Sequence, residues 1–388
     1  MSAGARKPHV ALLGSRGIPN RYGGYETLME ELAARLVERG WRVTVYGRRH
    51  AVPHGLTEHR GAQLRVLPTL ATKHLDTPVH TLLSTLDAAL DRGAPFDAAL
   101  VVNSANALFV PILRTAGIPT ALHVDGIEKR RAKWGRFGRF VYAVSERLAC
   151  VVADALVTDA EVIRRHYEER YGADSVPIAY GVEPRPLAAD APVDDGRSVL
   201  ARLGVEPRRY LLYVSRFEPE NNPHRVVEAY GRVGGDMPLV MVGSAPYAGR
   251  FIDEMKAAAD DRVLFPGAIY GDGYRQLLSH AFAYVQATEV GGTHPALVEA
   301  MGYGNALLVN EAPENREVAG DDALYFRAAE PATFAAAVEA LLAASPAEMA
   351  RRRTAAAARA ERLYSWPRVV DRYEALFRRL VASRRDLK

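Results

Sequence analysis

The chain has 388 residues, of which 48% are hydrophobic and 25% are charged, a balance typical of globular rather than disordered proteins. The length predicts two or three domains, and a net charge of +4 is too small to indicate a nucleic-acid-binding protein. The single cysteine, Cys150, excludes an internal disulfide and fits a reducing compartment, and no apolar run is long enough to predict a membrane span.

Short apolar runs alternate with amphipathic stretches in the first half of the chain. Residues 9–15 predict a buried strand, and residues 26–39 predict a helix whose apolar side chains recur every three or four positions. Further strands are predicted at 42–47, 98–102 and 120–123. Strand followed by helix, repeated, predicts a parallel sheet covered by helices on both faces.

The alternation stops in a segment rich in Pro, Ala and Asp, which predicts a linker at 186–198, and then resumes. The remaining expected elements are a helix at 223–232, strands at 209–216, 238–243, 262–265, 283–287 and 306–310, and helices throughout the tail from 331. The predicted fold class is therefore α/β, with two doubly wound Rossmann-like domains, 1–185 and 199–365, facing across a cleft.

Two sequence features suggest that the domains bind an anionic ligand. Gly23 and Gly24 precede the first helix, where small residues let backbone N–H groups approach a ligand closely; a plain flexible turn is the alternative. Ser215 and Arg216 end the first strand of the second domain, where parallel-sheet proteins bind ligands. Arginine suits a diphosphate because its planar group donates two hydrogen bonds, although a surface ion pair would also explain it.

A glycine-rich turn, Gly292-Thr293-His294, opens a helix in the second domain and is the most specific stretch of the chain. Free N–H groups at a helix start can hold a phosphate. Glu299 on that helix can accept hydrogen bonds from two sugar hydroxyls, or can simply be a charge that complements the helix dipole.

In the first domain, His123 ends a predicted strand beside Asp125 and is a catalytic or a structural histidine. A basic segment with interleaved aromatic residues follows. It fits an anionic membrane surface or a lipid-phosphate acceptor, with single-stranded nucleic acid or a solvated helix face as alternatives. Its candidate contact residues are Lys129, Arg130, Arg131, Lys133, Trp134 and Arg136.

Five blocks occur in order along both domains: residues 14–36, 123–135, 215–222, 292–305 and 313–318. With these blocks, from about residue 9 to about residue 380, the chain resembles the retaining glycosyltransferases of family 4, which have the GT-B fold. The first block resembles the rhamnosyltransferase-like branch of bacterial cell-surface polysaccharide synthesis.

The resemblance implies a metal-independent hexosyltransferase that needs no cofactor. A hexose or deoxyhexose would pass from a nucleotide diphosphate sugar to a glycan acceptor. The expected partners are a lipid-linked glycan, in exopolysaccharide or O-antigen-type synthesis, and an anionic membrane surface, but no nucleic acid. We then expect a cytoplasmic protein, free or peripheral at the inner face of the plasma membrane. The resemblance also places helix 366–388 on the first domain. A non-catalytic GT-B scaffold or partner subunit, or a sugar-nucleotide epimerase, is the alternative.

Residue by residue, the resemblance assigns His123, Arg216 and Glu289 to catalysis. The donor would be bound by residues that match the family's motifs: Gly23, Gly24, Ser215, Arg216, Asn221, Asn222, Ile269, Gly292, Thr293, His294 and Glu299. Two positions depart from the family. Asn221 and Asn222 stand where it carries a lysine, and Gly291 stands where it carries the first acid of a Glu-x7-Glu pair. We expect Glu289, two residues earlier, to contact the sugar instead.

Overall fold

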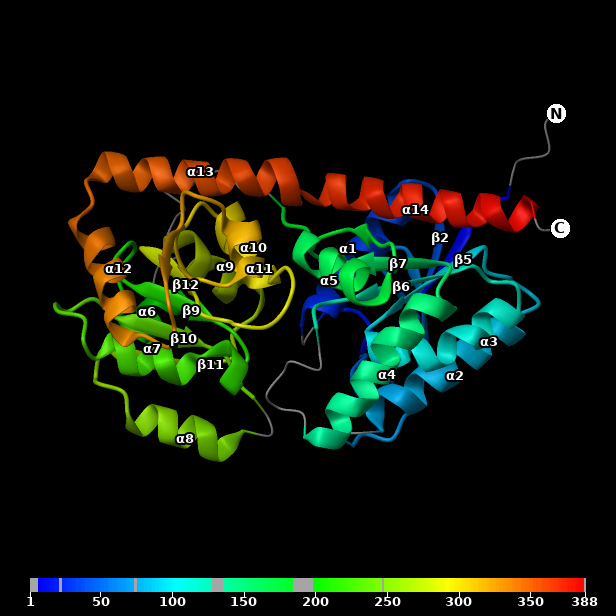
Figure 1. The fold of residues 1–388 in the computed structure, drawn as a ribbon, viewed down its shortest axis with the longest axis horizontal. Helices are drawn as coiled ribbons and strands as arrows, with labels where there is room; N and C mark the ends of the chain where they lie inside the picture. Colours follow the sequence, from blue (N-terminus) through cyan, green and yellow to red (C-terminus); the bar gives the residue numbers. More distant parts are fainter. Residues whose placement is uncertain are drawn as a thin grey trace. The chain divides into compact units, whose positions relative to one another are not determined.

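The computed structural model describes residues 6–20, 23–72, 75–127, 135–183, 198–245 and 248–386, and every structural statement below concerns these residues (Figure 1). The chain divides into two compact units. Among the described residues, unit 1 contains those within 6–127, 135–180 and 366–386, and unit 2 contains those within 181–365. Of the predicted linker 186–198, Ser198 alone is described. Its hydroxyl accepts a hydrogen bond from the amide of Ala201 and so caps the helix α6 (Val199–Leu203).

The described strands of unit 1 form an eight-stranded sheet in the order β3-β4-β2-β1-β5-β6-β7-β8, parallel except for β3 against β4. The strand β1 is buried along its whole length, as expected of a parallel strand covered on both faces. The strands are β1 (His9–Leu13), β2 (Arg42–Arg48), β3 (Glu58–His59), β4 (Ala62–Leu67), β5 (Ala98–Val102), β6 (Thr120–Val124), β7 (Ala155–Thr158) and β8 (Val176–Pro177).

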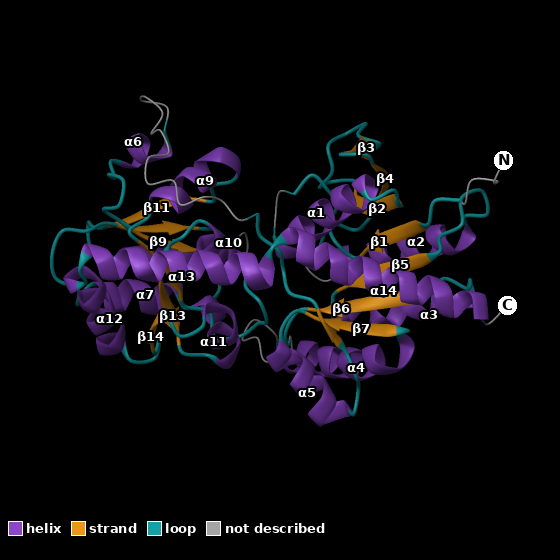
Figure 2. Ribbon diagram, turned by 90° about the horizontal axis from the view of Figure 1, so that it is seen from above, coloured by secondary structure: helices purple, strands orange, loops and turns teal. Residues whose placement is uncertain are grey.

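Two apolar cores lie on opposite faces of this sheet, because successive side chains of a strand point to opposite sides. Val10 and Leu12 belong to the core shared with α1 (Gly24–Glu38) and α14 (Trp366–Asp386). Ala11 and Leu13 belong to the other core. Figure 2 shows these strands with the helices around them. The helices against the second face are α2 (Asp76–Leu90), α3 (Val110–Thr115), α4 (Arg136–Val152) and α5 (Glu161–Tyr171), with the 3-10 helix η1 (Ser104–Phe109).

Helix α14 returns to unit 1 from the far end of the chain. Its buried side chains, at helical spacing, are Trp366, Val369, Val370, Tyr373, Leu376, Phe377 and Leu380. Arg39, the C-cap of α1, forms ion pairs with Asp371 at 2.7 Å and Glu374 at 2.8 Å, which add polar contacts at the edge of this apolar stripe. The helix is therefore an integral part of the unit 1 core.

The described strands of unit 2 form a six-stranded parallel sheet in the order β11-β10-β9-β12-β13-β14. They are β9 (Leu211–Val214), β10 (Leu239–Val242), β11 (Val263–Gly267), β12 (Ala283–Gln286), β13 (Ala306–Asn310) and β14 (Leu324–Phe326). The surrounding helices are η3 (Pro219–Asn221), α7 (Pro223–Tyr230), α8 (Gly249–Ala257), α9 (Gly271–His280), α10 (Pro295–Gly302), α11 (Pro313–Ala319), α12 (Pro331–Ala343) and α13 (Pro346–Tyr364).

Both sheets are doubly wound, which confirms the predicted fold class of two Rossmann-like α/β domains. In each, the strand order reverses beside the first strand: between β1 and β5 in unit 1, and between β9 and β12 in unit 2. Ligands of such sheets bind beyond the carboxyl ends of the strands at this reversal. The loops after β1, β5, β9 and β12 are therefore the places to examine.

Candidate active site

The loop after β9 carries Arg216 at the strand reversal of unit 2. The loop after β9 lies very close to the loop after β10. A Cβ atom added to Gly243 would lie 1.9 Å from the carbonyl oxygen of Ser215. The Arg216 guanidinium lies 3.5 Å from the Glu218 carboxylate, and 40% of the side chain is exposed. The ion pair considered from the sequence is thus formed, and the guanidinium still has surface available to a ligand.

Asn221 and Asn222, where the family carries a lysine, stabilise this loop through the backbone. The Asn221 amide donates to the carbonyl of Arg216 at 2.7 Å, and the Asn222 amide donates to the carbonyl of Ala287 at 2.8 Å. Asn222 also adopts a left-handed backbone with φ 56°, which asparagine tolerates better than most residues. The Asn221 amide thus closes the loop after β9 on itself, and the Asn222 amide joins it to the loop after β12. Their role toward a donor stays a prediction.

The loop after β12 is fixed from a second side by Asn315 of α11, which is fully buried. Its amide donates to the carbonyl of Thr288 at 2.9 Å and to that of Asn310 at 3.0 Å. The motif at 313–318 therefore has a structural function, because it holds the loop that carries Glu289.

Gly291 stands at the position of the missing family acid, and the structure shows a side chain packed closely over it. The His294 ring covers this glycine so closely that a Cβ would lie 2.5 Å from its Cε1 atom. No larger residue fits without moving that ring. Thr293 is buried beside it, and His294 is the N-cap of α10, whose first residue is Pro295.

Glu299 lies one turn into α10, and one of its oxygens is already engaged. The Tyr274 hydroxyl of α9 donates to its Oε2 at 2.6 Å. Burial raises the pKa of Glu299 above its ordinary value. The Glu299 carboxylate, anchored on one side, can present its other oxygen to a hydroxyl in a defined direction.

Ile269, predicted to pack against a base, follows β11 and is half-buried beside the start of α9.

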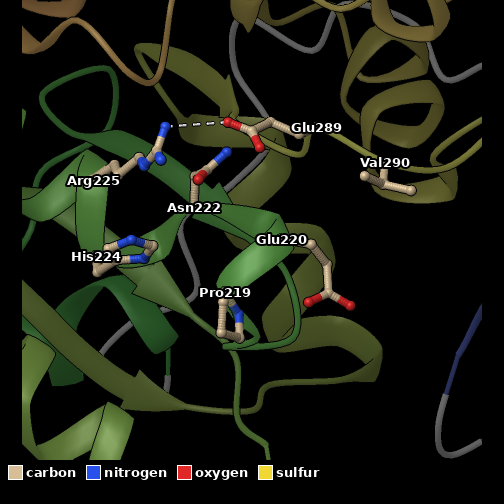
Figure 3. A pocket seen from close by; sticks show the side chains of 7 residues that line it. All are labelled: Pro219, Glu220, Asn222, His224, Arg225, Glu289 and Val290. Carbon is tan, nitrogen blue, oxygen red and sulfur yellow. Dashed lines mark hydrogen bonds and ion pairs between the residues drawn. The ribbon is translucent and has the colours of Figure 1, made fainter. Parts of the chain in front are cut away.

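A small pocket of about 220 Å³ lies between the loops after β9 and β12 (Figure 3). These loops are joined by a hydrogen bond from the Glu289 amide to the Glu220 carbonyl at 3.0 Å. The Glu289 carboxylate lies 3.3 Å from the Arg225 guanidinium and is 43% exposed. The Glu220 side chain is only 4% exposed, and neither of its oxygens has a hydrogen-bond partner among the described residues.

In unit 1 the loop after β1 is held to the first turn of α1. The Glu26 carboxylate, which is buried, accepts a hydrogen bond from the Arg16 amide at 2.8 Å. Gly23 is the N-cap of α1 and Gly24 its first residue. A Cβ atom added to Gly23 would have few neighbours, the nearest being Glu26 Oε2 at 3.5 Å. Gly23 therefore places no side chain of its own over the start of α1.

His123 is the fourth residue of β6 and is fully buried in unit 1. Its Nδ1 atom lies 3.0 Å from the Tyr373 hydroxyl of α14, and its Nε2 atom has no hydrogen-bond partner in the described part of the chain. The Tyr25 ring meets it edge-on at 5.7 Å, and the Tyr180 ring lies at 6.0 Å. Burial lowers its pKa to about 3, so the ring is neutral near pH 7.

The basic segment falls almost wholly outside the described residues: Lys129, Arg130, Arg131, Lys133 and Trp134 are not among them. Arg136, the first residue of α4, is described and exposed. No described helix has the length and hydropathy needed to cross a membrane. The described residues also contain no group of three or more His, Cys, Asp or Glu side chains that could hold a metal ion.

Comparison with protein families gives a match in each half of the chain. Residues 23–180 match the model described as a glycosyl transferase 4-like domain, and residues 201–360 match that of glycosyl transferases group 1. The chain belongs to the GT-B glycosyltransferases. No curated protein matches it in a sequence search.

Solved structures share this GT-B fold over nearly the whole chain. Sucrose-phosphate synthase from Thermosynechococcus elongatus superposes with a TM-score of 0.80 at 17% identity, covering 97% of this chain and 100% of its own. HepE from Anabaena, solved in complex with UDP-glucose, superposes with a TM-score of 0.75 at 16% identity, covering 95% of this chain and 99% of its own. An α,α-trehalose-phosphate synthase from Burkholderia vietnamiensis superposes with a TM-score of 0.70 at 14% identity, covering 96% of this chain and 100% of its own.

Three residues of these sites did not emerge from the sequence. Tyr274 holds Glu299 from 25 positions away, and Tyr373 holds His123 from 250 positions away. Neither has a motif of its own, and only the three-dimensional fold brings the partners together. Glu220 lies within a recognised block, between Arg216 and Asn221, but its burial without a partner is not visible in a sequence.

Proposed function

We propose that this glycosyltransferase retains anomeric configuration and moves a hexose or deoxyhexose from a nucleotide diphosphate sugar to a glycan acceptor. The observation that carries the proposal is the arrangement at the strand reversal of unit 2. Arg216 follows β9, and the glycine-rich turn and Glu299 follow β12, with Glu299 directed by Tyr274. These are the groups that a diphosphate and a ribose require.

Arg216 and the amides of the turn would bind the diphosphate and stabilise the charge that develops on it. Preorganised donors of this kind can supply much of the rate enhancement of an enzyme. We propose that these donors take the place of a metal ion in neutralising the diphosphate. Glu299 would bind the ribose through its free oxygen, and Ile269 would pack against the base.

Retention fits a front-side displacement in which the bond from the sugar C1 to the diphosphate oxygen breaks as the acceptor oxygen attacks from the same face. The new bond joins C1 to the acceptor oxygen, and the acceptor proton passes to the departing phosphate oxygen. No strong base is required. Glu289 would contact the sugar and His123 would orient the sugar or the incoming hydroxyl. The neutral ring of His123 suits such hydrogen bonding.

We further propose that the acceptor is lipid-linked, in exopolysaccharide or O-antigen-type synthesis, and that the enzyme acts at an anionic membrane surface. The exposed side of α4 supports this. It carries Phe140, which is 66% exposed, and Val144 and Val151, together with the exposed cations Arg136, Arg139 and Arg147. Apolar and basic groups on one helix face are typical of peripheral membrane helices.

The first experiment is thermal stabilisation against UDP, GDP, dTDP and their sugars in the presence of EDTA. A ligand at about 100 times its dissociation constant stabilises a fold by about 2.7 kcal/mol, which gives a clear shift. UDP-glucose leads the panel, because HepE was solved with it. A shift with one nucleotide family supports the proposal, and NMR of the product then reports the anomeric configuration. No shift with any of them would favour a non-catalytic scaffold, and sugar interconversion without an acceptor would favour an epimerase.

A further inference from the structure

The contact between α14 and His123 determines what the histidine can do. The Tyr373 hydroxyl and His123 Nδ1 are 3.0 Å apart, and both side chains are fully buried in unit 1. The Tyr25 and Tyr180 rings enclose the same imidazole. Because the ring is held on several sides, it has little freedom to flip, and each nitrogen keeps its own surroundings.

The direction of this hydrogen bond follows from counting protons. The neutral imidazole has one N–H, and the phenol has one O–H that must find an acceptor when buried. His123 Nδ1 is the hydrogen-bond partner of the phenol in the described part of the chain. If Nδ1 carried the proton, the Tyr373 proton would have no acceptor there, at a cost of about 1–3 kcal/mol for a buried unsatisfied group. The phenol therefore donates to Nδ1.

We propose that Tyr373 is a positioning residue that holds His123 as the tautomer protonated on Nε2. The other ring nitrogen then becomes a hydrogen-bond donor, since the bond made by one nitrogen sets the state of its partner. His123 Nε2 is buried and has no partner among the described residues, as expected of a donor reserved for a ligand. The proposal rests on the proposed function and adds that His123 donates to a sugar or acceptor oxygen rather than removing its proton.

The ligand class follows from this assignment. A neutral N–H donor suits a hydroxyl or ring oxygen of a sugar. It cannot accept the proton of the acceptor hydroxyl, which fits transfer of that proton to the leaving phosphate. His123 would thus help to select and orient the sugar. The C-terminal helix, far from the other site motifs in the sequence, would contribute to substrate recognition through one hydroxyl group.

The direct test is the ¹⁵N spectrum of the histidine-labelled wild-type protein, in which the His123 signals are identified by their loss in the variant His123→Ala. We expect the proton on Nε2 and an unprotonated Nδ1. A proton on Nδ1 would overturn the proposal. This measurement stands even if no nucleotide sugar is turned over, a result that would refute the proposed function but not the tautomer.

The kinetic test uses Tyr373→Phe, which keeps the ring and removes the hydroxyl. With the nucleotide sugar that passes the binding panel, we expect kcat to fall by roughly tenfold to a hundredfold, as is usual when a group that orients a functional histidine is lost. The affinity for the nucleotide diphosphate alone should not change. Tyr167→Phe is the matched control, because Tyr167 is buried in unit 1 and its hydroxyl has no partner among the described residues.

A double-mutant cycle separates positioning from a general structural role. If Tyr373 acts through His123, Tyr373→Phe should cause no further loss in the His123→Ala background. An equal loss in both backgrounds would show that the hydroxyl serves the fold, and a wild-type rate in Tyr373→Phe alone would remove it from the reaction. Either result would overturn the proposal.

Discussion

Arg216 is the residue on which the donor site depends most directly. We expect Arg216→Ala to lower kcat by about a hundredfold to a thousandfold, the usual loss when one preorganised donor is removed from a developing negative charge. Stability should change little, because the pair with Glu218 is partly exposed and such pairs contribute little. Arg209→Ala, which changes a 61% exposed arginine two residues before β9, is the matched control and should keep the wild-type rate. Equal rates for both variants would remove Arg216 from the mechanism.

Glu289 is the carboxylate expected to contact the sugar in place of the acid missing at position 291. Glu289→Gln should lower turnover while leaving the affinity for the free nucleotide diphosphate unchanged, since it removes a charge near the sugar and not near the phosphates. Glu228→Gln on α7 alters an acid that is similarly exposed and similarly paired with an arginine. If Glu289→Gln turns over the donor as fast as Glu228→Gln does, the assignment is wrong.

The strand ends that carry the candidate donor-site residues could be predicted from the sequence, but the contacts of those residues could not. Position after a buried strand was enough to place Arg216, His123 and the turn before α10 at the carboxyl edges of their sheets, since parallel strands bring those ends together. The departure at Gly291 was visible in the sequence, whereas the packing of the His294 ring over this glycine requires coordinates. Side-chain geometry of this kind leaves no periodic pattern.

At the scale of elements, the buried strands were the easiest to predict, since continuous apolar runs such as 98–102 mark strands covered on both faces. The strand β4 was missed because it is only half-buried, with charged and polar residues between its apolar ones. The strands β3, β8 and β14 were missed because two or three residues carry too little periodicity to be recognised, and the four-residue strand β7 was missed as well.

Helix α4 provides a test of membrane attachment. The double variant Phe140→Ser/Val144→Ser should bind less to vesicles that contain anionic lipid, because it removes apolar area from the exposed face. Wild-type binding should also weaken in high salt, which screens the arginines of that face. Co-sedimentation measures both effects. Leu90→Ser, which changes a 73% exposed leucine on α2, serves as control. Binding that is equal on neutral and anionic vesicles would contradict the proposed surface.

At the scale of the whole molecule, unit 1 should respond to acid in a characteristic way. Burial lowers the pKa of His9 and His80 to about 4 and that of His123 to about 3. The unfolded chain protonates its histidines near pH 6.5, so below that pH it binds more protons than the folded chain. Each ring then lowers the free energy of unfolding by up to about 1.4 kcal/mol per pH unit. Burial raises the pKa of Glu26, so this carboxyl raises the free energy of unfolding as the pH falls, but it is one group against three histidines.

The tryptophans allow this prediction to be measured. Trp41 and Trp366 are both buried in unit 1, and a Trp134→Phe background leaves them as the two fluorescent indoles of the chain. We expect the urea midpoint to be lower at pH 5.5 than at pH 7. His80→Gln should reduce that difference, because it removes one of the three rings that must be protonated. The same midpoint at both pH values would contradict the assignment of buried neutral histidines.

The return of α14 has a consequence for the order of events during synthesis. Unit 1 is discontinuous: its sheet is complete by residue 180, but its last core helix is made only after residues 181–365. At about 5–20 residues per second, the ribosome needs roughly 10 to 40 s to add that stretch. During this interval the apolar face that α14 later covers lacks its partner, and His123 lacks Tyr373. A nascent chain can therefore carry both sheets and still be without its histidine contact, which is made only when the last helix emerges.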